Sequence, residues 1–177
     1  LGVKYKISQG YVHAAAPKGL IGSKIHFPKI SVGATENLII AASLAKGISI
    51  LSNCAIEPEI KDLVNFLKKM GCKLKWIAKR SIKIIGVDHL NEASYSVMFD
   101  RIEAGTYLIA AAITEGSLKI KNVKPQVIKT EIDILKKIGA KIKVKKSEIH
   151  IEGRKKIKSI NLKTAPWPGL ATDLQAQ

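Results

Sequence analysis

The sequence predicts a mixed α/β fold built from a repeated unit of helix, strand, helix and two strands. Hydrophobic residues make up 46% of the 177 residues, which is typical of a globular protein. Helical patterns that end at glycine alternate with short strand patterns. The segment 41–47 recurs at 110–116, and the segment 68–75 recurs at 136–143, with one deletion aligning the two copies. One such unit cannot bury a sheet and two helices alone, so several must pack together.

In the first half of the chain, strands and helices are expected to alternate. Strands are expected twice within 4–15, around Ser8-Gln9-Gly10, and again at 24–27, 48–51, 73–78 and 81–85. Helices are expected over 35–46 and from Glu57-Pro58 to Gly71. Ser31 or Thr35 is the expected cap of the first helix. Proline in the first turn and acidic residues at the positive end favour the start of the second helix.

The same order returns in the second half of the chain. Helices are expected over 102–115 and from Pro125 to Ile138, and strands at 95–98, 118–120, 140–144 and 148–151. Asp100 is a candidate cap for the helix at 102–115, with Glu103 three residues later in a pattern that resembles a capping box. This structural role is the simplest explanation of both acids.

Lys29-Ile30-Ser31-Val32-Gly33, with Ala34 to Asn37 behind it, carries the clearest local chemistry. A helix start exposes unpaired N–H groups and partial positive charge, so it binds anions readily. Lys29 adds a full charge, and Gly33 lets a ligand approach the backbone. The stretch therefore predicts a seat for a phosphate or diphosphate. An ordinary strand-to-helix turn with a surface lysine is the competing interpretation, since the motif alone is short.

The net charge of +16 raises the question of a nucleic-acid partner. The basic residues are almost all lysine, the arginines being Arg80, Arg101 and Arg154, and aromatic residues make up 5%. Arginine is the preferred reader of bases, and aromatic rings are the stacking platform for single strands. Nucleic-acid binding is therefore a minor interpretation, although the lysines could attract an acidic substrate.

Three further features concern a membrane helix, the two cysteines and the ends of the chain. No apolar run approaches the roughly 20 residues that a membrane helix needs. Cys54 and Cys72 form no metal-binding or disulfide pattern, which favours reduced thiols in a cytoplasmic protein. The strand-like start without methionine and the abrupt end suggest an internal fragment of a longer chain.

A proline-rich loop near the end, from Ala165 to Gly169, presents Thr172-Asp173 at the mouth of the next element. An aspartate in this position is most often a helix cap, and a catalytic carboxylate is the alternative.

Four motifs together resemble one family. They are residues 27–37, Glu57-Pro58-Glu59-Ile60, residues 100–106 and residues 172–177. Their order and spacing, over the whole chain, are similar to those of the bacterial UDP-N-acetylglucosamine 1-carboxyvinyltransferases (MurA). The resemblance implies an enolpyruvyl-transferase inside-out α/β barrel of two domains, each with three copies of the repeat. Residues 1–98 would complete the first domain, and residues 99–177 would begin the second. The family's proline before Asp100 is Phe99 here, and its Phe-Pro before Thr172 is Leu170-Ala171.

The resemblance also implies a reaction and its residues. The enolpyruvyl group of phosphoenolpyruvate would move to the 3-hydroxyl of UDP-N-acetylglucosamine, with release of phosphate, in peptidoglycan synthesis. Asp173 would be the general base. The family's substrate contacts fall on Lys29, Ile30, Ser31, Val32, Gly33 and Asp173, and its cleft or hinge positions on Glu57, Glu59, Asp100 and Arg101. No cofactor, metal, nucleic acid or membrane is implied, and the oligomeric state is open.

Several alternatives stay open at this point. The acceptor could be shikimate 3-phosphate, as in the related enzyme; the chain could be a lysine-rich nucleic-acid-binding module; or it could be a degenerate paralogue. The family's reactive loop residue and its C-terminal arginines lie outside these 177 residues. We therefore expect the isolated chain to be inactive.

Overall fold

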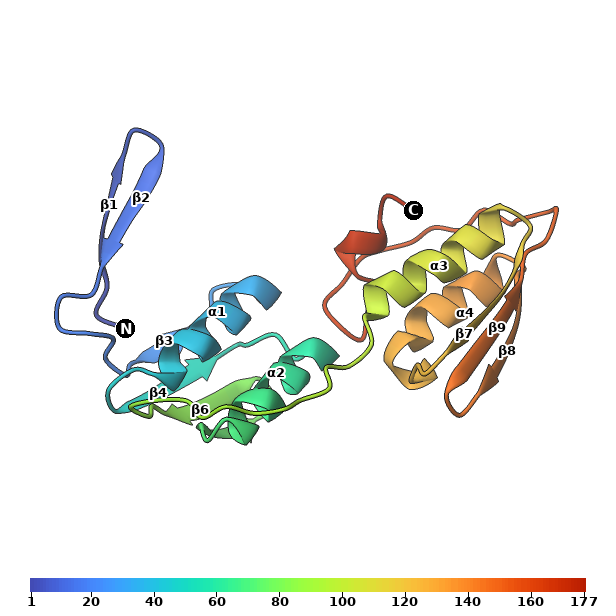
Figure 1. The fold of residues 1–177 in the computed structure, drawn as a ribbon. Coiled ribbons are helices and arrows are strands. Elements are labelled where there is room, and N and C mark those ends of the chain that lie inside the picture. Colours follow the sequence, from blue (N-terminus) through green and yellow to red (C-terminus); the bar gives the residue numbers. More distant parts are fainter. The chain divides into compact units, whose positions relative to one another are not determined.

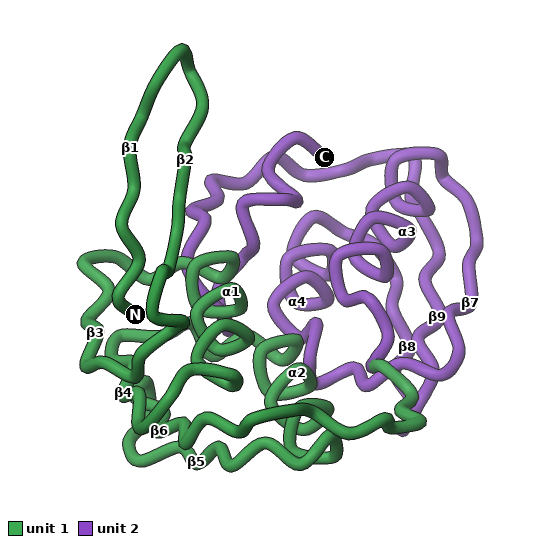
Figure 2. Tube along the Cα trace, turned by 60° about the vertical axis from the view of Figure 1, so that its left-hand side comes forward, with its two compact units in different colours: residues 1–97 green, residues 98–177 purple.

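The computed structural model describes residues 1–177, which divide into two compact units, Leu1–Val97 and Met98–Gln177. Figure 2 colours the two units separately. Each unit buries its own cluster of apolar side chains and is therefore a packing unit in its own right. The assignment of the units to parts of two larger domains stays a prediction.

The first unit is built on a four-stranded sheet with two helices packed against it (Figure 1). Its strands are β3 (Lys24–His26), β4 (Ile48–Ser52), β5 (Lys73–Ala78) and β6 (Ser81–Ile85), in the spatial order β3-β4-β6-β5. β3 runs parallel to β4, and the other pairs are antiparallel. A separate antiparallel hairpin joins β1 (Lys4–Ser8) to β2 (Tyr11–Ala15).

Helix α2 (Pro58–Lys69) confirms the sequence prediction. Its buried residues Ile60, Val64 and Leu67 recur at helical spacing and join the core of the first unit. Proline occupies the first position, an acidic residue lies in the first turn, and two lysines lie in the last turn. Each of these choices matches the charge and hydrogen-bonding needs of its helix end.

Helix α1 (Val32–Ser43) begins and ends three residues earlier than the predicted range of 35–46. Ser31, one of the two candidate caps, occupies the N-cap position. At the other end, the backbone of Lys46 donates to Leu20 and accepts from Gly22, with bonds of 2.8 Å each. This bridge to the segment before β3 draws Lys46 out of helical geometry, which a local pattern does not reveal.

The segment after β6 is not a strand, contrary to the prediction for residues 95–98. Tyr95 instead packs against α2: its ring stacks on Phe66 at 5.1 Å between centroids, and its hydroxyl donates to Asp62 at 2.8 Å. The backbone of Asn91 donates to Met70 at 2.8 Å. An extended segment forms a strand only when a neighbouring strand pairs with its backbone, and these contacts go to a helix and its end.

The second unit places α3 (Arg101–Ile113) and α4 (Lys129–Lys137) against a three-stranded antiparallel sheet (Figure 1). The strands are β7 (Ser117–Lys121), β8 (Lys141–Lys145) and β9 (Glu148–Glu152), in the order β7-β9-β8. The helix expected from Pro125 starts as the 3-10 segment η1 (Pro125–Ile128). A second 3-10 segment, η2 (Thr172–Leu174), lies near the end of the chain.

The internal repeat is confirmed by topology and by backbone angles. Strands β4-β6-β5 and β7-β9-β8 have the same order and the same antiparallel pairing. Asn53 and Asn122, which the sequence repeat aligns, both have a φ of 59°. The pairing of β5 with β6 contains a register shift between Trp76 and Ala78 that β8 and β9 lack. One residue is therefore missing from the second hairpin, in addition to the deletion seen in the sequence.

No helix in the structure is long and apolar enough to span a membrane.

Candidate functional site

The start of α1 is the helix start at which the sequence predicts an anion seat. Ser31 is extended at the N-cap, and its Oγ accepts a hydrogen bond from the backbone N–H of Ala34 at 3.3 Å. The N–H groups of Ser31, Val32 and Gly33 precede the first intrahelical bond and keep their capacity to donate. A helix start with three such donors and a partial positive charge can bind a phosphate group.

Two residues around this start are open to a ligand. Lys29 is exposed, and its amino group makes no hydrogen bond or ion pair with another residue of the chain. A Cβ added to Gly33 would meet no atom within 4 Å. Ile30 and Val32 are half-buried and pack against the core of the first unit, which holds the backbone of the seat in place.

Thr35 stabilises the first turn of α1 through two hydrogen bonds. From the sequence it was predicted only as an alternative cap. Its side chain is fully buried. The hydroxyl donates to the carbonyl of Ser31 at 2.7 Å and accepts from the N–H of Ala55 at 3.0 Å. This hydroxyl thus ties the first turn of α1 to the loop after β4. No local signal distinguishes it, because the partner at Ala55 is 20 residues away.

The predicted cleft residues Glu57 and Glu59 lie at the start of α2 with a third carboxylate nearby. Glu57 is the buried N-cap residue, and Glu59 is half-buried in the first turn. Burial raises the pKa of Glu36 on α1, and the charges of Glu59 and Glu57 raise it further. Glu36 was not singled out from the sequence. No group of three or more His, Cys, Asp or Glu side chains in residues 1–177 is arranged to hold a metal ion.

Asp100 is a helix cap, as its simplest interpretation predicts. Its carboxylate accepts from the backbone N–H groups of Ile102 at 2.8 Å and Glu103 at 3.1 Å. Arg101 is buried at the first position of α3. Burial raises the pKa of Glu131, and the positive charge of Arg101 acts in the opposite direction. A hinge role for Asp100 and Arg101 stays a prediction.

Asp173 lies in η2 and is exposed. The interpretation of Asp173 as a helix cap is wrong, because the N-cap position belongs to Ala171. Its carboxylate makes no hydrogen bond or ion pair with another residue of the chain. Asp173 belongs to the second unit, and the anion seat belongs to the first. A carboxylate that caps nothing and faces solvent keeps both oxygens available to accept hydrogen bonds from a ligand.

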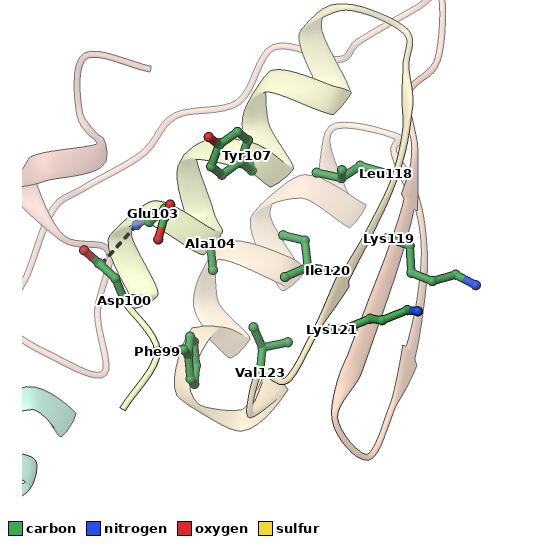
Figure 3. A pocket seen from close by; sticks show the side chains of 10 residues that line it. All are labelled: Phe99, Asp100, Glu103, Ala104, Tyr107, Leu118, Lys119, Ile120, Lys121 and Val123. Atoms are coloured by element: carbon green, nitrogen blue, oxygen red, sulfur yellow. Dashed lines mark hydrogen bonds between the residues drawn. The ribbon is translucent and has the colours of Figure 1, made fainter. Parts of the chain in front are cut away.

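A pocket of about 440 Å³ lies between α3 and β7 in the second unit (Figure 3). Its lining is mostly apolar, with Phe99, Tyr107 and Ile120 among the larger side chains. Asp100 reaches it from the helix start, where its carboxylate is engaged as the cap (Figure 3). The pocket therefore brings together none of the residues that the sequence assigns to substrate.

Comparison with known proteins decides the family. The sequence model for EPSP synthase (3-phosphoshikimate 1-carboxyvinyltransferase) matches residues 1–177. The chain belongs to the EPSP synthase family. Within this family, the chain is 72% identical over 177 residues to the UDP-N-acetylglucosamine 1-carboxyvinyltransferase of Pelagibacter ubique (strain HTCC1062). It is 50% identical over 177 residues to the protein of that name from Endomicrobium trichonymphae. Both alignments cover 100% of this chain and 42% of the relative. The resemblance found in the sequence is thereby confirmed.

Solved structures confirm the mixed α/β fold. The enolpyruvyl transferase NikO from Streptomyces tendae matches with a TM-score of 0.82 at 20% identity, covering 98% of this chain and 44% of that one. The EPSP synthase from Acinetobacter baumannii matches with a TM-score of 0.62 at 21% identity, covering 90% and 38%. At this identity the likeness concerns the fold alone. The chain thus spans less than half the length of the relatives and solved structures named above.

Proposed function

We propose that the full-length protein containing this chain is a UDP-N-acetylglucosamine 1-carboxyvinyltransferase that acts in the cytoplasm, in peptidoglycan synthesis. The observation that carries the proposal is the 72% identity, across all 177 residues, to a relative of that name. The substrates would be UDP-N-acetylglucosamine and phosphoenolpyruvate. In the net reaction, the 3-oxygen of the sugar bonds to C2 of phosphoenolpyruvate, the C2–O bond to phosphate breaks, and the hydroxyl proton leaves with the phosphate.

The start of α1 supports binding of the sugar nucleotide. The N–H groups of Ser31, Val32 and Gly33 would donate to the diphosphate, and Lys29 would add a charge-assisted hydrogen bond. Ile30 would contact the nucleotide beside them. These contacts exist before and after the chemical step, so they would hold the acceptor rather than accelerate the reaction.

The carboxylate of Asp173 supports the proton transfer. It would accept the proton of the 3-hydroxyl as that oxygen attacks C2. The C2=C3 double bond opens in the same step and C3 takes up a proton, which gives the tetrahedral adduct. Loss of phosphate from C2 and of a proton from C3 then restores the double bond. Its exposure and its lack of a partner within the chain leave its oxygens accessible to the hydroxyl of a bound substrate. Glu57, Glu59, Asp100 and Arg101 would lie around the reacting groups without touching them.

The test follows phosphate release by the full-length protein. Phosphoenolpyruvate is supplied with either UDP-N-acetylglucosamine or shikimate 3-phosphate, and we expect release only with the sugar nucleotide. Release only with shikimate 3-phosphate would contradict the proposed acceptor. Release with neither acceptor would favour a degenerate paralogue, and salt-dependent nucleic-acid affinity would then be measured.

Two variants separate the proposed roles in the same assay. Asp173→Asn should lower kcat by about 10²–10⁴-fold, the usual contribution of a general base. Lys29→Ala should raise the KM for the sugar nucleotide by about tenfold, with kcat nearly unchanged, because it removes uniform binding. Asp88→Asn and Lys79→Ala, which change an exposed aspartate and an exposed lysine, are the matched controls.

A further inference from the structure

We propose that Gly105 on α3 is a positioning residue for Asp173 and acts through Leu174. The inference rests on the proposed function of Asp173. η2 packs against α3 (Figure 1). Leu174 is 4% exposed, whereas its neighbour Asp173 is exposed. Successive side chains of a 3-10 turn point about a third of a turn apart, so the direction in which Leu174 is buried sets the direction of Asp173.

The space that Leu174 occupies exists because residue 105 has no side chain. A Cβ added to Gly105 would lie 3.1 Å from Cδ1 and 3.5 Å from Cδ2 of Leu174. It would also lie 3.7 Å from Cγ of the buried Glu131, so the added atom has little room to move toward Glu131. An added methyl group at this position must therefore displace Leu174 by a few tenths of an ångström, and Asp173 with it.

The backbone does not explain glycine at this position. Gly105 is inside α3 and has no positive φ, so alanine could adopt its conformation. Glycine inside a helix is less stable than alanine. Gly105 thus lowers the stability of α3 but leaves room for the side chain of Leu174, as a positioning role requires.

The rest of the loop is held on both sides of Asp173, so that Leu174 is its inner contact. After η2, Nε2 of Gln177 donates to Oγ1 of Thr106 on α3 at 3.0 Å. Before η2, Oγ1 of Thr130 on α4 donates to the carbonyl of Pro168 at 2.6 Å. With both flanks anchored, a shift at Leu174 is concentrated on η2 rather than dispersed along the loop.

The experiment measures kcat, both KM values and the thermal midpoint of the full-length protein carrying Gly105→Ala. We expect kcat to fall by about tenfold, since a misplacement of 1 Å can cost about 10²-fold. We expect each KM to stay within about twofold and the midpoint to hold or rise. Gly116→Ala is the matched control: its Cβ would approach Thr114 Oγ1, also at 3.1 Å, at the opposite end of α3 and away from η2.

A second variant tests the contact from its other side. Leu174→Ala adds no atom to the helix and should also lower kcat. In the double variant, kcat should fall no further than in the worse single variant, because both changes break the same contact. Where Gly105→Ala does not fold, Leu174→Ala alone still tests the contact, because wild-type kcat in that variant would remove the positioning role.

Three results would overturn the inference. Wild-type kcat in either single variant would remove the positioning role. A Gly105→Ala protein in which the thermal midpoint falls and both KM values rise would show a general structural role. A double variant whose loss equals the product of the single losses would show that the residues act independently. Inactivity of the wild-type protein with the sugar nucleotide would instead overturn the proposed function, and this inference with it.

Discussion

At the scale of single residues, burial separates side chains that the sequence presents as alike. The lysine at the helix start is exposed and unpaired, whereas Arg101 is buried. Of the acids singled out from the sequence, Asp173 faces solvent and Glu57 is buried. Residue type and spacing correctly predicted the cap formed by Asp100, because a cap depends on neighbours within three residues.

Glu36→Gln should make protein stability less sensitive to pH. Burial and the charges of Glu59 and Glu57 raise the pKa of Glu36 in the folded protein, so ionisation disfavours that state. The stability associated with the raised pKa is present below the unfolded value of about 4.3 and is lost as the pH rises through the folded pKa. The thermal midpoint of the variant should exceed that of the wild type at pH 7–8 and match it below about pH 4.

The control for this prediction is Glu92→Gln, which changes an exposed glutamate outside the carboxylate group. It should leave the midpoint unchanged at every pH. A Glu36→Gln midpoint below that of the wild type at pH 8 would contradict the sign derived from burial and like charges.

Cys54 should resist thiol reagents in the folded protein. Burial raises its pKa to about 11, despite opposing hydrogen bonds and the nearby charge of Arg80. Its side chain is fully buried, and Cys72 is 5% exposed. Since the thiolate is the reactive form, both should stay unmodified by iodoacetamide at pH 7.5 until the protein is denatured. Peptide mapping by mass spectrometry measures this directly, and native-state modification of either cysteine would contradict the burial.

At the scale of elements, most boundaries follow from local sequence. Helix α2 and the strands β5 and β6 lie where their patterns place them. The C-terminal end of α1 and the segment after β6 differ from the prediction, because residues far along the chain decide them. Lys46 is held by the segment before β3, and Tyr95 is held by α2. A helix or strand pattern contains no information about such partners.

Thr35→Val should weaken both the fold and the anion seat. Valine has nearly the same shape but cannot accept from the buried N–H of Ala55 or donate to Ser31. Leaving a buried donor unpaired costs about 1–3 kcal/mol. We expect the free energy of unfolding to fall by that amount, and the KM for the sugar nucleotide to rise if the first turn of α1 binds it.

Thr114→Val is the matched control for this change. Its hydroxyl also donates to a carbonyl four residues earlier, at 2.8 Å, but it is exposed. We expect a change of less than about 0.5 kcal/mol in the free energy of unfolding. Equal losses for the two threonines, measured by denaturant titration, would mean that the bond to Ala55 contributes nothing.

At the scale of the whole molecule, the repeat organises both units. Each contains two helices packed against three antiparallel strands of the same order, around a core of its own. The chain corresponds to 42% of the length of its curated relatives, so a complete catalytic centre is not expected from these residues alone.

The isolated 177-residue chain should therefore give no turnover with phosphoenolpyruvate and UDP-N-acetylglucosamine. The resemblance places the reactive loop residue and the C-terminal arginines outside it, and those groups would carry part of the phosphoenolpyruvate chemistry. The assay is phosphate release by the chain and by the full-length protein at equal concentration. Measurable turnover by the chain alone would contradict this prediction.

The sequence by itself determined the internal repeat, the cap of α3, the helix start beside Lys29 and, apart from the strand expected at 95–98, the order of the helices and strands. All of these depend on side-chain periodicity and on neighbours a few residues apart. Only the tertiary structure decided that Thr35 bonds to Ala55, that Glu36 joins Glu57 and Glu59, and that Gly105 makes room for Leu174. Burial, carboxylate repulsion and close packing depend on which segments distant in the sequence come into contact, and packing of the core determines those contacts.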